Sequence, residues 1–165
     1  MTSLGRLTEL RVMKSAVTVA VATLAIVGVA PAGAAASVIY WKYRHTVTGT
    51  CLTTYASGKI LTLPCEQENN AQEWHWINSS WNGDYRLLKN KWTGKCLIST
   101  EPVSSGSCED WTSRHWGNVR LNDGTYLLLN SQTRKYLIPV SGGVGLTDSL
   151  ASSAWQAQAL VIVKP

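Results

Sequence analysis

The chain has 165 residues, 45% of them hydrophobic, with 15 basic and 10 acidic residues, a net charge of +5, and four cysteines. This length suits one domain with its own hydrophobic core. The basic residues form no continuous run, and their densest group is Arg86, Lys89, Lys91 and Lys95. Apolar residues interrupt this group, as in a strand with one solvated face. We therefore expect no nucleic-acid partner.

The N-terminal residues 1–36 have the three-part pattern of a secretory signal peptide. A basic leader precedes the uncharged apolar run Ala16–Ala30, and small residues follow, with cleavage expected after Ala34 or Ala36. A membrane anchor is the alternative, but 15 residues are short for a span of roughly 20. Residues 1–36 hold three of the basic residues and one acidic residue, which leaves a net charge of +3 for residues 37–165. We therefore predict a secreted protein that is not inserted in a membrane after cleavage.

The rest of the sequence consists of short apolar or aromatic runs separated by turn residues, which predicts strands. In the first third, strands are predicted at Val38–Arg44, Cys51–Tyr55, Lys59–Leu63 and Glu73–Ile77, with Glu66–Gln72 as a loop or a single helical turn. In the second third, strands are predicted at Asp84–Asn90, Lys95–Ser99 and His115–Val119, with Glu101–Gly106 as a loop. In the last third, they are predicted at Thr125–Asn130, Tyr136–Val140 and the apolar run Ala159–Val163, which we expect to be a buried closing strand.

An internal repeat organises these elements. The stretch Trp92–Leu97 has counterparts at Thr48–Leu52 and Thr133–Leu137. A tryptophan closes each copy, and these are Trp74, Trp116 and Trp155. Solenoids and propellers share this period, but they grow by adding units, and this chain has only three. No segment after residue 36 sustains the spacing of an amphipathic helix, so an all-β structure closed with threefold pseudo-symmetry is predicted.

All four cysteines follow the signal peptide, and an even number in an exported chain indicates disulfides. The repeat favours Cys51–Cys65 and Cys96–Cys108, because each bridge then lies at the same place in its own copy. Zinc is the competing hypothesis, but the sequence has no C-x-x-C pair and no histidine at ligand spacing, so we expect no metal and no cofactor.

These features resemble the ricin-type β-trefoil, the R-type lectin family. The first copy carries Gly49–Leu52, then Cys65, then Gln72-Glu73-Trp74, and the second keeps Gly94–Leu97 and Cys108. The resemblance implies one domain at 37–165, with repeats at about 38–82, 83–119 and 120–165. It also implies that these three four-stranded repeats close a six-stranded barrel with a hairpin cap.

The sugar-contacting positions of that family are altered here. An aspartate two residues after the first cysteine is replaced in every copy, by Thr53, Ile98 and Ile138. Leu63 and Gly106 replace an aromatic ring, and Ala71 replaces an asparagine, whereas Gln72 remains. If a sugar pocket persists in the first copy, Thr53, Leu63 and Gln72 should line one concavity.

Five tryptophans are not explained by the repeat, and some of them should be exposed; they are Trp41, Trp76, Trp81, Trp92 and Trp111. Trp81 with Asn82 and Asp84, or Trp111 with Asp110 and Glu109, would make a relocated sugar site, and loop packing explains either group equally well. The candidate carbohydrate-binding residues are Thr53, Asn70, Gln72, Trp81 and Trp111.

Catalysis has little support in the sequence, because none of the three histidines lies in a nucleophile motif and the acidic residues Glu66, Glu68 and Glu73 suit a solvated loop. Two hypotheses remain. In the first, the protein is a secreted, non-catalytic module that binds carbohydrate through an altered site. In the second, it has lost sugar binding and is an interaction subunit, either an adaptor in a secreted assembly or an inhibitor, with a secreted protein as its partner.

Overall fold

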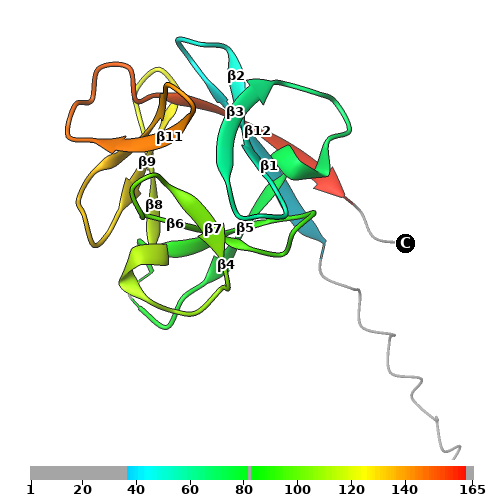
Figure 1. Ribbon diagram of the computed structural model, residues 1–165, viewed down its shortest axis with the longest axis vertical. Helices are drawn as coiled ribbons and strands as arrows, with labels where there is room; N and C mark the ends of the chain where they lie inside the picture. The colour runs from blue at the N-terminus through cyan, green and yellow to red at the C-terminus, as the bar shows by residue number, and fades with distance from the viewer. Residues whose placement is uncertain (1–36, 82, 163–165) are drawn as a thin grey trace, which may run out of the picture. The chain divides into compact units, whose positions relative to one another are not determined.

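The structure is a computed structural model that describes residues 37–81 and 83–162 (Figure 1). The predicted signal peptide lies outside these residues, as does Asn82 of the candidate site. No helix in the described part of the chain is long and apolar enough to cross a membrane.

The described residues form twelve strands and two short 3-10 helices, in three groups of four strands. The first group is β1 (Val38–His45), β2 (Thr50–Thr54), β3 (Ile60–Pro64), η1 (Asn70–Gln72) and β4 (Trp74–Asn78). The second is β5 (Arg86–Asn90), β6 (Cys96–Ile98), β7 (Ser104–Gly106), η2 (Thr112–Arg114) and β8 (Trp116–Arg120). The third is β9 (Tyr126–Asn130), β10 (Tyr136–Val140), β11 (Gly143–Thr147) and β12 (Trp155–Ile162).

Six of the strands form a closed antiparallel ring. The pairs run β1–β4, β4–β5, β5–β8, β8–β9, β9–β12 and β12–β1, and the eight-residue pairing of β12 with β1 closes the barrel (Figure 1). The other six strands pair as the hairpins β2–β3, β6–β7 and β10–β11. Backbone hydrogen bonds from Ser105 to Gly58 and from Val103 to Val144 tie these hairpins to one another. This architecture is a β-trefoil, as predicted.

The hydrophobic core repeats four positions three times. The last strand of each group contributes a tryptophan, and its indole Nε1 donates to a carbonyl of the second strand at 3.0–3.1 Å. The other three positions come from the first, second and third strands or their edges. The twelve core residues are Tyr43, Leu88 and Leu128; Leu52, Leu97 and Leu137; Ile60, Val103 and Val144; and Trp74, Trp116 and Trp155.

The predicted disulfides are both present. Cys51 bonds to Cys65 and Cys96 to Cys108, so each bridge stays within one repeat. Tyr136 occupies the first cysteine position of the third repeat, because it pairs with β9 as Cys96 pairs with β5. The third hairpin is therefore held by its β10–β11 ladder without a bridge.

Two details differ from the sequence-based expectations. Ser104–Gly106, predicted as loop, is the strand β7, because it pairs with the preceding strand of its hairpin. The prediction of a buried run at Ala159–Val163 is wrong for Ala159, which is exposed at the end of the barrel, and Leu160 is half-buried. The side chains of residues 161–163 lie outside the described part.

A buried side chain at the end of the first strand of each repeat connects neighbouring repeats. Asn90 donates to the backbone carbonyls of Asn70, Ala71 and Glu73, and its oxygen accepts from the N–H groups of Trp92 and Thr93. Asn130 makes the matching bonds to Ser113, His115, Gln132 and Thr133. In the first repeat His45 takes this place, with Nδ1 accepting from Thr48 and Nε2 against the Ser152 carbonyl.

We expect Asn90→Ala and Asn130→Ala each to lower the free energy of unfolding by about 3 kcal/mol, because each leaves several buried backbone groups without partners. Urea denaturation at neutral pH measures the loss. Gln132→Ala, at an exposed position, is the control and should change stability by less than about 0.5 kcal/mol. Equal unfolding midpoints for Asn90→Ala and the control would contradict a structural role for this amide.

Candidate functional site

Two of the predicted sugar-binding residues, Thr53 and Gln72, lie in the interior of the first repeat. Their exposed fractions are 3% and 0%. The Gln72 amide nitrogen donates to Thr53 Oγ1 at 3.2 Å and to the Pro64 carbonyl at 2.9 Å, and its oxygen accepts from the Glu66 N–H. Since both amide hydrogens are engaged inside the protein, this pair presents no free donor to a ligand.

The residues equivalent to Gln72 perform the same structural task in the other repeats. Arg114 Nε donates to the Ser107 carbonyl at 2.7 Å, and Ser153 Oγ donates to the Ser149 carbonyl at 2.6 Å. Each bond fastens the end of the third strand to the segment that precedes the core tryptophan. The fold therefore requires a hydrogen-bond donor at this position, and glutamine, arginine and serine each supply one.

Gln72→Ala should lower the free energy of unfolding by about 2 kcal/mol, because it removes the partners of the Pro64 carbonyl and the Glu66 N–H. Thermal and urea unfolding measure this loss. The variant is consequently a poor probe of sugar binding, since a loss of binding would follow from the destabilised loop. Unchanged stability would show instead that water replaces the amide without cost.

The third predicted residue, Asn70, lies at an open hollow of about 380 Å³. Five residues between positions 66 and 71, in the β3–β4 connection, form one wall, and the exposed Trp92 forms the other. The lining residues are Glu66, Glu68, Asn69, Asn70, Ala71 and Trp92. The hollow thus combines two carboxylates, two amides and one aromatic face.

Hydrogen bonds fix both walls of this hollow, which we call the Trp92 hollow. Asn69 Oδ1 accepts from the Ala71 N–H at the start of η1, and its amide donates to the Glu66 carboxylate at 2.8 Å. Asn90 binds carbonyls of the first wall and the Trp92 N–H of the second. One buried side chain therefore joins the backbone of the segment Asn70–Ala71 to the backbone of Trp92.

The remaining two predicted residues, Trp81 and Trp111, flank a single contact between two loops. The Ser80 N–H donates to the Asp110 carboxylate, and Asp110 also bonds His115 Nε2. The Trp81 ring stacks at 5.1 Å from the His115 ring, and the Arg114 guanidinium lies 4.8 Å from the Trp111 ring centre. The two alternative sites of the sequence prediction are therefore neighbours, with indoles that are 47% and 61% exposed.

Asp110 is the electrostatic centre of this surface. Hydrogen bonds from the Ser80 hydroxyl and backbone N–H, and then the bond to His115, lower the pKa of its carboxyl to about 2. The ionised form is favoured because each of these partners donates to it. The contact therefore holds the two loops together as long as Asp110 is charged.

We expect this contact to weaken as the pH falls from about 4, near the unfolded pKa of Asp, towards about 2. It is fully present above that range, because a depressed folded-state pKa stabilises the ionised state. An NMR titration of the Asp110 carboxyl carbon should give a midpoint near 2, and the Trp81 indole signals should shift with it. A midpoint near the unfolded value would contradict the contact.

Three of the groups that could serve in catalysis or metal binding already have partners in the described part of the chain. His45 caps a turn, His115 bonds Asp110, and Glu73 pairs with Lys91. No cluster of three His, Cys, Asp or Glu side chains among the described residues is arranged to hold a metal ion.

The sequence prediction did not include Trp92, Glu66 and Glu68 in a site. Comparison of the repeats offers a signal for Trp92, since it occupies a turn position that is Val47 in the first repeat and Gln132 in the third. The sequence gives no such signal for the two glutamates, because acidic residues are equally common in a solvated loop and in a loop that lines a binding hollow.

Comparison with known proteins supports the fold. The sequence model of the cytolethal distending toxin A/C domain matches residues 35–110, which is less than half of the chain. No curated protein matches the sequence.

Several solved structures share the architecture at low sequence identity. The designed threefold-symmetric protein ThreeFoil superposes with a TM-score of 0.65 at 20% identity, covering 73% of this chain and 99% of that one. A chain of the Haemophilus ducreyi cytolethal distending toxin gives 0.60 at 16% identity, covering 71% and 81%. SeviL bound to the asialo-GM1 saccharide gives 0.61 at 16% identity, covering 73% and 97%. At these identities the likeness shows the β-trefoil fold.

Proposed function

We propose that the protein is a secreted, non-catalytic carbohydrate-binding module and that the Trp92 hollow is its sugar site. The observation that carries this function is one open hollow lined by an exposed tryptophan, two glutamates and two asparagines. Aromatic rings pack against the apolar face of a sugar, and carboxylates accept strong hydrogen bonds from its hydroxyl groups.

The asymmetry of the three repeats supports this location. The buried amide of Asn90 and its counterpart Asn130 hold equivalent turns, but the exposed turn residue is Trp92 in one case and Gln132 in the other. The first repeat has Val47 at this place, 69% exposed. Among these three equivalent turns, only the turn of the second repeat therefore has an exposed aromatic side chain.

The proposed site differs from the one that the ricin-type resemblance implies. Thr53 and Gln72 are structural in this proposal, and Asn70 is the one residue of the predicted pocket that contacts the ligand. The sugar-bound SeviL structure favours a carbohydrate ligand by analogy of fold. The predicted signal peptide at residues 1–36 and the two disulfides favour an extracellular location.

A glycan array with the purified protein tests this function, followed by titration of the best neutral glycan. Trp92→Ala should weaken that binding about tenfold or more, because truncation of a central aromatic contact costs about 2 kcal/mol and about 1.4 kcal/mol corresponds to a factor of ten. Trp111→Ala removes an equally exposed indole from the other surface and serves as the matched control. Equal affinities for the two variants would rule out the Trp92 hollow.

The alternative function is a protein-interaction subunit, with the Trp81–Trp111 surface as its contact. Exposed indoles are frequent anchors of protein interfaces, and the match to a toxin A/C domain agrees with assembly. Absence of glycan binding together with one stoichiometric protein partner, lost in Trp111→Ala and retained in Trp92→Ala, would favour this alternative.

A further inference from the structure

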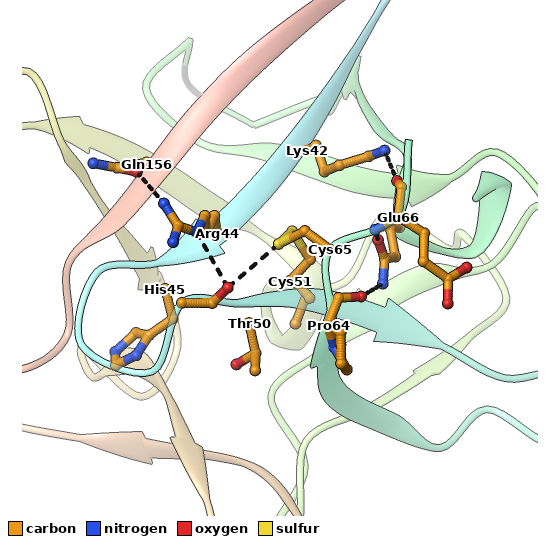
Figure 2. Close-up of a disulfide and its surroundings, with 12 residues drawn as sticks. Lys42, Arg44, His45, Thr50, Cys51, Pro64, Cys65, Glu66 and Gln156 are labelled. Carbon is orange, nitrogen blue, oxygen red and sulfur yellow. Dashed lines mark hydrogen bonds between the residues drawn. A yellow bond between two sulfur atoms is a disulfide. The ribbon is translucent and has the colours of Figure 1, made fainter. Parts of the chain in front are cut away.

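A second hollow, of about 200 Å³, lies beside the first disulfide and contains no acidic side chain. Its lining comes from Lys42 and Arg44 of β1, from the bridge Cys51–Cys65 and from residues 156–158 of β12. Figure 2 shows Lys42, Arg44, Gln156 and the two cysteines. We call this space the Lys42 hollow. It has room for a few molecules of water at about 30 Å³ each, or for one small charged group.

The strand register places two cations opposite two amides on the outer face of the barrel. Lys42 pairs with Gln158 and Arg44 with Gln156 across the β1–β12 ladder. Successive side chains alternate between faces, and Tyr43 between the two cations is a core residue. All four polar side chains therefore lie on one side of the sheet.

Both cations have neutral partners only. Lys42 Nζ binds the backbone carbonyls of Glu66 and Gln67, and Arg44 donates to the Gly49 carbonyl and to Gln156 Oε1 (Figure 2). Among residues 37–81 and 83–162, no carboxylate lies within 4.0 Å of either charged group. Lys42 is nevertheless only 6% exposed.

A buried ammonium without a counter-ion is unfavourable, because carbonyl dipoles replace its hydration only in part. The equivalent positions of the other repeats avoid this cost, since they are the buried Leu87 and Leu127. An anion in the Lys42 hollow would meet a lysine and an arginine that both retain unused donors, and the free amide hydrogens of Gln156.

We propose that the Lys42 hollow binds the carboxylate or sulfate group of an acidic saccharide. The choice of a saccharide rests on the proposed function, whereas the anion site does not. The two hollows adjoin the same segment: Glu66 lines the Trp92 hollow, and its carbonyl binds the lysine that lines the Lys42 hollow. An oligosaccharide with a neutral and an acidic residue would suit this pair of sites.

Gln158→Glu is the decisive variant, because it keeps the shape of an exposed side chain and supplies a carboxylate opposite Lys42. We expect it to weaken binding of inorganic sulfate and of acidic glycans about tenfold, through neutralisation of Lys42 and repulsion of the ligand. Gln132→Glu makes the same charge change at an exposed turn and should bind like the wild type. NMR titration at constant ionic strength, with sodium chloride as the reference, follows sulfate at Lys42, Arg44 and Gln156.

The same glycan array, with pairs that differ only by sulfate or sialic acid, tests the saccharide. A preference for the acidic members that Gln158→Glu removes and Gln132→Glu retains is expected. Sulfate that leaves the Lys42 hollow unperturbed, equal behaviour of the two glutamine variants, or an array without preference for acidic members would each overturn the proposal.

Trp92→Ala separates this site from the first one. It should reduce neutral glycan binding and leave sulfate binding at Lys42 unchanged. Loss of the sulfate signals in Trp92→Ala would contradict two distinct sites.

Discussion

The buried side chain that ends the first strand of each repeat is the contact on which this trefoil depends. Asn90 and Asn130 each bind carbonyl groups of the preceding repeat and N–H groups of their own turn. Buried backbone N–H and C=O groups need hydrogen-bond partners, and these particular groups are not paired within the strand ladders. The asparagine amide is their partner. His45 achieves a related arrangement with a ring in place of an amide. Each of these side chains thereby links its repeat to a neighbouring one.

Buried positions that the fold requires are repeated in all three copies, whereas other positions differ between the copies. The core tryptophans make one hydrogen bond in three copies, and Gln72, Arg114 and Ser153 perform one task with three side chains. Exposed positions face no such demand. Trp92 is exposed and Lys42 is buried on the outer side of the sheet, and neither has a counterpart of the same chemistry in the other repeats; they line the two hollows beside segment 66–67.

Much of the fold was predictable because its signals are local or periodic. The strand runs alternate, the cysteines recur, and the closing tryptophans have a nearly constant spacing, so the disulfides and the core indoles were predicted correctly. The errors fall where a partner decides the outcome. Ser104–Gly106 is polar and becomes a strand through pairing with Cys96–Ile98, and Ala159 is apolar but lies at the exposed end of the barrel.

By itself, the sequence determined the repeat, the disulfide pairing and the all-β architecture, since each depends on residue types at a regular spacing. Only the tertiary structure decided which polar groups are available. Gln72 was a candidate ligand contact by position, and the structure shows that it is buried and that three hydrogen bonds occupy its amide. Trp92 and the Glu66 segment are distant in sequence, and the Asn90 amide brings them to one hollow. The physical reason is that burial and contact between repeats arise from chain closure, which local sequence does not encode.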